Sequence, residues 1–77
     1  MQKKKLTNVG VGCSCVIEHY TDDDIKLKLM EMGCLPGEVI KVERIAPLGD
    51  PMAIAVAGYT LSVRLSEADT VIVNTID

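Results

Sequence analysis

Hydrophobic and polar residues alternate along most of this chain. The two-residue period is clearest over residues 13–20, 38–45, 52–57 and 59–64, and a shorter run closes the chain at 71–73. Successive side chains of a strand point to opposite faces, so this period predicts strands that bury one face and expose the other. The pattern therefore predicts about five short strands.

Residues 22–32 instead show helical spacing. Ile25, Leu29 and Met32 recur at i, i+4 and i+7, which places them on one face of a predicted helix. Lys26 and Glu31 lie off this stripe, and Lys28 and Glu31 are expected on a solvated face of the helix.

The ends of that helix are marked by capping residues. Thr21 or Asp22 can accept from its first amides, and the acidic run 22–24 suits the positive end of the helix dipole. Gly33 is expected to end the helix, because the residue just past a helix commonly takes a positive φ. A second, single helical turn is predicted at 66–69, with Ser66 as its cap.

Two segments rich in glycine and proline separate these elements. GCLPGE at 33–38 places Pro36 and Gly37 at the central positions of a type II turn. APLGDP at 46–51 encloses a Gly-Asp corner between two prolines, which cannot donate to a sheet ladder and so predict a loop. Gly58 predicts a hairpin turn. Because closure of a sheet removes exposed edges, we expect a mainly β protein, a small barrel of about five strands with one inserted α-helix.

Size and composition fit one domain. The 77 residues are treated as a single domain, residues 1–77, with the lysine-rich residues 1–5 as a flexible tail.

A net charge of −3 and the absence of Phe and Trp argue against nucleic-acid binding, which uses basic faces and base-stacking rings. No apolar run is long enough for a membrane span and no signal peptide is recognisable. We therefore expect a cytoplasmic protein without direct membrane insertion.

Little in the chain suggests catalysis or a cofactor. His19 is the only histidine, and no partners for a catalytic triad accompany it. The chain is therefore predicted not to be an enzyme and to need no cofactor.

A metal site is the main alternative. Cys13 and Cys15 share one face of the first strand with Val11 and Ile17, and His19 and the acidic run 22–24 follow. Cys, His and carboxylate groups can bind zinc or ferrous iron. The C-x-C spacing nevertheless differs from the usual C-x-x-C of structural zinc sites, and free cysteines are often core residues. The favoured interpretation is a structural role and no metal, with Cys13, Cys15 and His19 as the alternative ligands.

Three sequence blocks together resemble the FeoA family. They are GCLPGE at 33–38, RIAPLGDP at 44–51 and LSVRLSEA at 61–68, and the resemblance extends over residues 6–73. One departure is Lys28, where the family commonly has an arginine. This difference matters because lysine cannot make the planar bidentate contact that arginine makes with a carboxylate or phosphate. The resemblance implies an SH3-like barrel that accompanies the bacterial ferrous iron transporter FeoB.

The function that this resemblance implies is that of an accessory protein of ferrous iron uptake. It would bind the cytosolic side of FeoB, with the GTP-binding domain as the expected contact, and modulate its activity. Candidate partner-binding residues surround the two turns: Met32, Leu35, Leu48, Asp50, Met52 and Arg64. One of the two arginines, Arg44 or Arg64, is expected to pair with Asp50, Glu43 or Glu67.

Two other functions stay open from the sequence. One is an iron or zinc chaperone or sensor that uses the cysteines and His19. The other is an SH3-like regulatory module related to iron-dependent repressors, although a chain that begins at Met1 leaves no room for their upstream domains, so a stand-alone protein is expected. The sequence also leaves homo-oligomerisation open.

Overall fold

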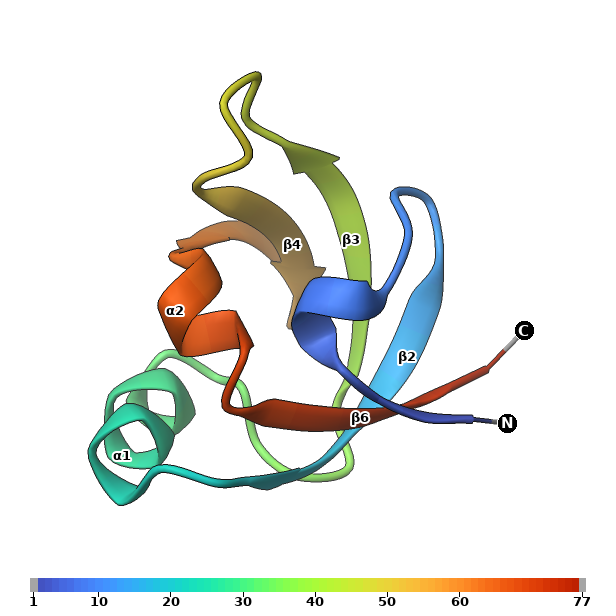
Figure 1. The fold of residues 1–77 in the computed structure, drawn as a ribbon. Helices are drawn as coiled ribbons and strands as arrows, with labels where there is room; N and C mark the ends of the chain where they lie inside the picture. The colour runs from blue at the N-terminus through green and yellow to red at the C-terminus, as the bar shows by residue number, and fades with distance from the viewer. Residues whose placement is uncertain (1, 77) are drawn as a thin grey trace.

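The computed structural model describes residues 2–76, which form one curved sheet with two α-helices at its side (Figure 1). The elements in chain order are β1 (Lys3–Lys5), the 3₁₀ helix η1 (Leu6–Asn8), β2 (Ser14–Tyr20), α1 (Asp23–Glu31), β3 (Val39–Ile45), β4 (Met52–Val56), β5 (Tyr59–Val63), α2 (Leu65–Ala68) and β6 (Val71–Thr75). The mainly β fold class is confirmed, with six antiparallel strands among these residues where about five were predicted, and a second short helix.

The additional strand lies where a flexible tail was predicted. Lys3, Lys4 and Lys5 pair with the last strand, whose antiparallel register joins Lys4 to Val73. Ion pairs from Lys3 to Glu18 (3.1 Å) and from Lys5 to Asp69 (3.5 Å) hold the strand. The tail prediction was wrong for residues 3–5, because three lysines carry no hydrophobic alternation that would reveal a strand. Met1 lies outside the described residues.

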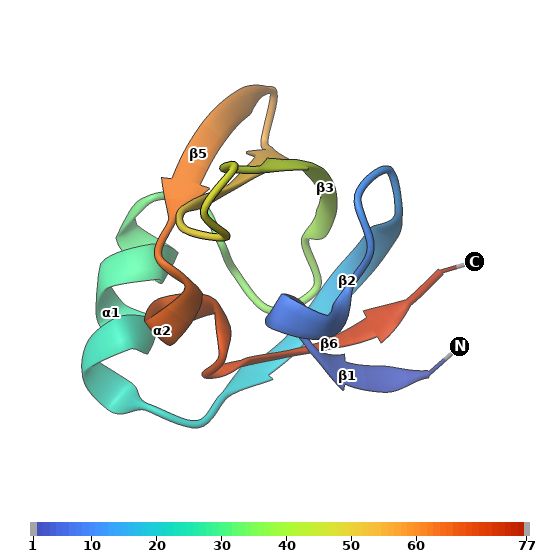
Figure 2. The same ribbon diagram turned by 45° about the horizontal axis from the view of Figure 1, so that its top comes forward.

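The strands lie in the order β1-β6-β2-β3-β4-β5. Among the described residues no ladder joins β1 to β5, so the sheet has two edges. Between them α2 packs against η1, and the Thr7 hydroxyl donates to Oδ1 of Asp69 at 3.2 Å (Figure 2). The barrel is therefore closed by helices on that side rather than by hydrogen bonds between strands.

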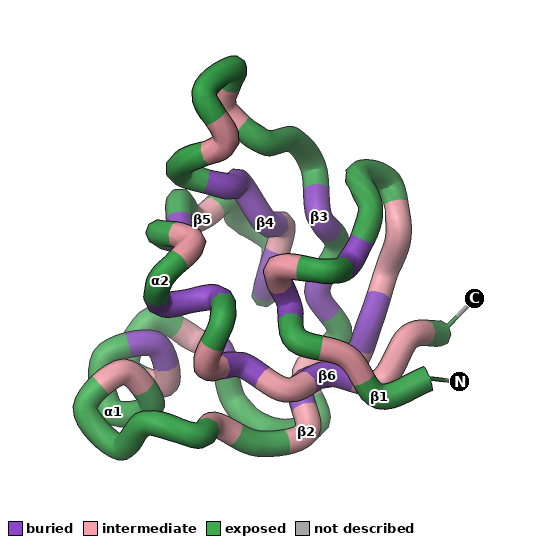
Figure 3. Tube along the Cα trace, viewed as in Figure 1, coloured by how far each residue is buried: buried purple, intermediate pink, exposed green. Residues whose placement is uncertain are grey.

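Burial follows the predicted alternation in the first part of β2 and of β3, whereas β4 is buried at consecutive positions, Met52, Ala53 and Ile54. Figure 3 shows buried residues alternating with exposed ones along β3, and they include Ile40 and Val42. Val11 was predicted on the inner face of the first strand but precedes β2 in an exposed turn. Since phenylalanine and tryptophan are absent, the core consists of valine, isoleucine, leucine, methionine, alanine and cysteine.

The two predicted turns after α1 are confirmed. Gly33 ends the helix with φ +99°, and a Cβ added there would lie 3.0 Å from the hydroxyl of Tyr59. Gly37 takes φ +94°, and the N–H of Glu38 donates to the carbonyl of Leu35 at 2.9 Å, as in a type II turn. Gly58 forms the predicted hairpin turn together with Ala57, which also has positive φ.

Candidate functional site

A cavity of about 370 Å³ lies between α1, the end of β5, α2 and the β3–β4 loop. We call it the α1–β5 cleft, and it is lined by Lys28, Leu29, Met32, Asp50, Pro51, Ser62, Arg64 and Glu67. Three of the six predicted partner-binding residues, Met32, Asp50 and Arg64, therefore come together around one cavity although the chain separates them widely.

Asp50 connects the β3–β4 loop to α2. Its Oδ1 accepts a hydrogen bond from the backbone N–H of Leu65, the first residue of the helix, at 3.0 Å. Oε1 of Glu67 accepts from the N–H of Arg64 at 3.2 Å. The predicted cap Ser66 was wrong, because these two carboxylates already satisfy the free amides at the start of the helix.

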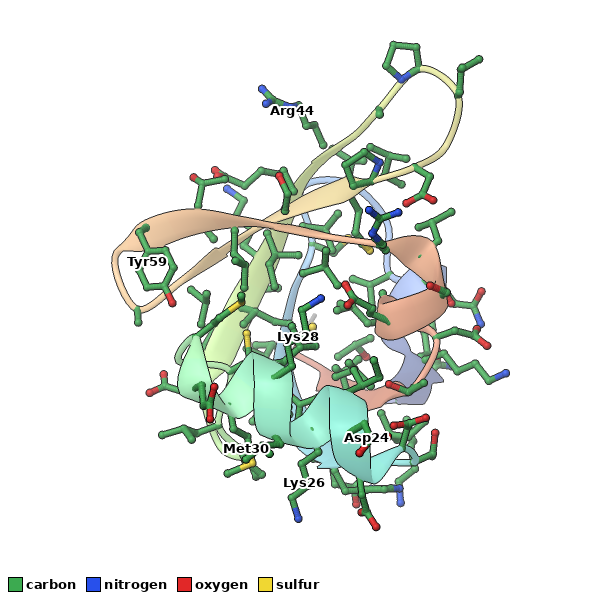
Figure 4. All side chains as sticks on the ribbon, turned by 90° about the vertical axis from the view of Figure 1, so that its left-hand side faces the viewer. Asp24, Lys26, Lys28, Met30, Arg44 and Tyr59 are labelled. Atoms are coloured by element: carbon green, nitrogen blue, oxygen red, sulfur yellow. The ribbon has the colours of Figure 1, made fainter. Side chains whose placement is uncertain are left out.

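Lys28 and Glu67 connect α1 to α2. The Lys28 ammonium donates to Oε2 of Glu67, whose side chain is only 10% exposed. This hydrogen bond is the largest cause that lowers the pKa of the Glu67 carboxyl below its ordinary value of 4.5. Burial raises that pKa, but the hydrogen bond from the Arg64 N–H and the positive charges of Lys28 and Arg64 lower it further. Lys28 was predicted to be a solvated residue of the helix, but its ammonium group is paired with Glu67. Figure 4 shows the Lys28 side chain between α1 and β5, whereas Lys26 points away from β5.

The two arginines lack the predicted carboxylate partners. Within residues 2–76 neither Arg44 nor Arg64 forms an ion pair, and Glu43 instead accepts from the Thr60 hydroxyl at 2.9 Å. Arg64 contributes its backbone to α2 and lies exposed on the wall of the cleft. Its guanidinium is therefore available for an external acceptor.

Leu48 lies at the tip of the β3–β4 loop with 96% of its surface exposed. The loop is held by two backbone bonds: the N–H of Gly49 donates to Ala46 at 2.7 Å, and the N–H of Ala46 donates to Pro51 at 3.0 Å. Asp50 and Pro51 of the same loop line the cleft. The loop thus presents an exposed leucine two positions before Asp50, the first of its residues to line the cavity.

Two predicted site residues do not join this surface. Met52 is fully buried opposite Val63 in the β4–β5 ladder, so its assignment to a binding surface was wrong. Leu35 is 43% exposed, but it precedes β3 whereas Leu48 follows that strand. The two leucines therefore lie at opposite ends of the seven-residue β3, and the structure does not bring them together.

The alternative metal ligands are also not brought together. Cys15 is fully buried in the core, and burial raises the pKa of its thiol to about 11, with a further contribution from Cys13. His19 lies exposed, beyond a register shift of β2, next to Glu18. Within residues 2–76 no group of three or more His, Cys, Asp or Glu side chains is arranged to hold a metal ion. Cys15 therefore lies in the core and His19 on the surface.

Five of the eight residues that line the cleft were not predicted as site residues: Lys28, Leu29, Pro51, Ser62 and Glu67. Leu29 was recognised only as a core residue of the helix. The available signal was the pairing of a lysine on the helix with a glutamate in LSEA, but these lie 39 positions apart and nothing local connects them.

Comparison with known proteins identifies the family. The family model described as FeoA domain matches residues 4–75. The chain belongs to the FeoA family. A FeoA-like protein from Clostridium acetobutylicum is 31% identical, with a TM-score of 0.91, over 100% of this chain and 91% of the other.

Two further structures place the fold. FeoA from Stenotrophomonas maltophilia, solved with zinc, is 28% identical with a TM-score of 0.78, covering 92% of this chain and 89% of its own. It is described as a prokaryotic SH3 domain protein with a suggested role as a ferrous iron transport activating factor. IdeR from T. acidophilum is similar over 97% of this chain and 35% of its own, with a TM-score of 0.83, but at 23% identity this shows the fold alone. The SH3-like fold is thereby confirmed for this FeoA-family domain.

Proposed function

We propose that this FeoA-family domain is an accessory protein of bacterial ferrous iron uptake that binds the cytosolic side of FeoB and changes its activity. The expected contact is the GTP-binding domain of the transporter. The family is associated with ferrous iron transport, which supports a transporter as the partner. Neither helix among residues 2–76 is long and apolar enough to cross a bilayer. The domain acts in the cytoplasm as an interaction module, without catalysis and without a cofactor.

The exposure of Leu48 is the observation that carries this proposal. A leucine that is 96% exposed buries almost no apolar surface in the folded domain, so its side chain contributes little to folding. The loop that presents it is constrained by its own hydrogen bonds and by the bond from Leu65 to Asp50. Constraint before binding reduces the entropy that is lost on docking. Leu48 is thus suited to anchor the domain in an apolar pocket of the partner.

The α1–β5 cleft supports the same face. Its walls combine the apolar Met32, Leu29 and Pro51 with the guanidinium of Arg64, which forms no ion pair within residues 2–76. An apolar centre with polar groups around it is the usual composition of a protein-binding surface. Leu48 and the cleft form what we call the docking face.

Titration of the purified domain into the cytosolic portion of FeoB, followed by calorimetry, tests the proposal. The titration is run with GDP, with a non-hydrolysable GTP analogue and without nucleotide, and the rate of GTP hydrolysis is measured at saturation. Saturable binding together with a changed hydrolysis rate is the expected result. Absence of binding in all three conditions would contradict the proposed function.

A further inference from the structure

The free edge of β5 offers hydrogen-bonding groups beside the α1–β5 cleft. Val56 pairs with Tyr59 across the two-residue hairpin turn, which makes them a hydrogen-bonded pair. Hydrogen-bonded and non-hydrogen-bonded pairs alternate along an antiparallel ladder, so Thr60 and Ser62 belong to non-hydrogen-bonded pairs. Their N–H and C=O groups therefore point away from β4. Within residues 2–76 no hydrogen bond is formed by the backbone N–H and C=O groups of Thr60 and Ser62; only the Thr60 hydroxyl is bonded, to Glu43. The edge therefore presents two donors and two acceptors at the spacing of an extended chain.

The two edges of the sheet differ in their protection. β1, at one edge, consists of Lys3, Lys4 and Lys5, and lysines on an edge strand discourage pairing with another chain. β5, at the other edge, has the sequence YTLSV, with no charge, no proline and no register shift against β4. The edge beside the docking face is thus the one that lacks the usual safeguards.

The cleft next to this edge selects the chemistry of an occupant. Ser62 belongs both to the free edge and to the wall of the cleft, and Arg64 follows two residues later. Glu67 is already paired with Lys28, and Asp50 accepts from Leu65, whereas the Arg64 guanidinium has no ion-pair partner within residues 2–76. A carboxylate is the natural acceptor for that guanidinium. Met32 and Pro51 would contact an apolar side chain next to the carboxylate.

The size of the cleft favours an extended segment over a helix. A helix with its side chains is about 10–12 Å across, whereas a cavity of about 370 Å³ accommodates only a few side chains. In β-strand addition the main chain supplies the hydrogen bonds, and pockets select alternate side chains. A free edge with one pocket beside it matches that mode.

The geometry points to strand addition: an extended segment of the partner, carrying a carboxylate next to an apolar residue, pairs with the edge of β5 and directs its carboxylate to Arg64. This inference rests on the proposed function, because the occupant is assigned to the cytosolic portion of FeoB. A second copy of this chain is the competing occupant, since two β5 edges could pair with each other.

Amide hydrogen exchange on the unmodified domain tests the inference, with the cytosolic portion of FeoB as the probe. The outward amides of Thr60 and Ser62 are expected to exchange at least about tenfold more slowly in the complex, as amides do when a ladder forms over them. The amide of Leu61, which already points to β4, is the internal control and should change less. Binding that leaves Thr60 and Ser62 unprotected would overturn strand addition while the proposed function stands. No binding at all would overturn both.

Two variants test the same contact from the side of the domain. Ser62→Pro removes the outward N–H without removing a bond to β4, and proline is tolerated on edge strands. Its affinity for the FeoB portion is expected to fall about tenfold or more, whereas Ser62→Ala, which keeps the N–H, should bind as the unmodified domain does. Equal binding by Ser62→Pro and Ser62→Ala would overturn the inference. Protection of Thr60 and Ser62 that grows with domain concentration in the absence of FeoB would assign the edge to a second copy and overturn it too.

Discussion

Lys28 on α1 and Glu67 on α2 form an ion pair across 39 positions of sequence, and this pair forms part of the α1–β5 cleft. Glu67 accepts from Lys28 with one carboxylate oxygen and from the N–H of Arg64 with the other. The pair therefore fixes the relative position of the two helices and neutralises the buried carboxylate beside Arg64.

Replacing Lys28 is expected to destabilise the fold. In Lys28→Met the nearly buried carboxylate of Glu67 loses its cation, and because the lysine is half exposed we expect a loss of about 1–2 kcal/mol in the free energy of unfolding. Urea denaturation at neutral pH measures it. Lys26→Met is the matched control, since Lys26 lies on the same helix and forms no ion pair within the described residues 2–76; it should change stability by less than about 0.5 kcal/mol. Equal losses in both variants would contradict the structural role of the pair.

The same pair predicts how stability depends on pH. The pKa of Glu67 is lower in the folded domain than its ordinary value of 4.5, so the ionised form is favoured by folding. Its contribution is complete above that value and is lost as the pH falls through the lowered folded pKa. The unfolding free energy of the unmodified domain should therefore decrease more steeply than that of Glu67→Gln between about pH 5 and pH 3. Parallel curves for the two proteins would show that Glu67 is not coupled to folding.

Gly33 should be intolerant of substitution, unlike Gly10. Gly33→Val places a β-branched residue at φ +99° with its Cβ 3.0 Å from the hydroxyl of Tyr59, whereas a Cβ at Gly10 meets only Cys13 Sγ at 3.8 Å. We expect Gly33→Val to cost about 2 kcal/mol more than Gly10→Val in thermal or chemical unfolding. Adding Tyr59→Phe should recover part of that loss, by removing the close contact. Equal losses at the two glycines would contradict the assigned turn.

The cysteines should differ in reactivity according to burial. Cys15 and Cys34 are buried, and burial raises the pKa of both thiols, so the folded domain should react at these positions only as it unfolds. Cys13 is partly exposed and should be alkylated first. Mass spectrometry of the labelled peptides, with and without denaturant, gives the three rates. Fast labelling of Cys15 in the folded domain would contradict its position in the core and make it available as a metal ligand again.

Local signals in the sequence predicted the parts of the fold that depend on neighbouring residues. Alternation revealed β2 to β5, and the positive φ required at Gly33 and Gly37 marked the turns. The strand at Lys3–Lys5 was missed because its partner β6 lies at the other end of the chain and its lysines show no apolar face.

The candidate site could be predicted only in part for the same reason. Leu48 was predicted from two prolines that enclose a loop, which is local information, and its exposure agrees. Met52 directly follows that loop and was assigned to the surface, although the cross-strand neighbour Val63 buries it. The cleft itself arises from contacts between α1, α2 and the loop that no spacing along the chain announces.

The affinity of Leu48→Asp for the cytosolic portion of FeoB tests the central proposal most directly. Leu48 has almost no contact with the rest of the domain, so the thermal midpoint should stay within about 2 °C. A charge placed against an apolar pocket of the partner should weaken binding by about 2–4 kcal/mol. Val11→Asp is the matched control, because Val11 is also an exposed apolar residue in a turn but lies outside the docking face, and it should bind normally. A folded Leu48→Asp domain that binds FeoB as tightly as Val11→Asp would contradict the proposed docking face.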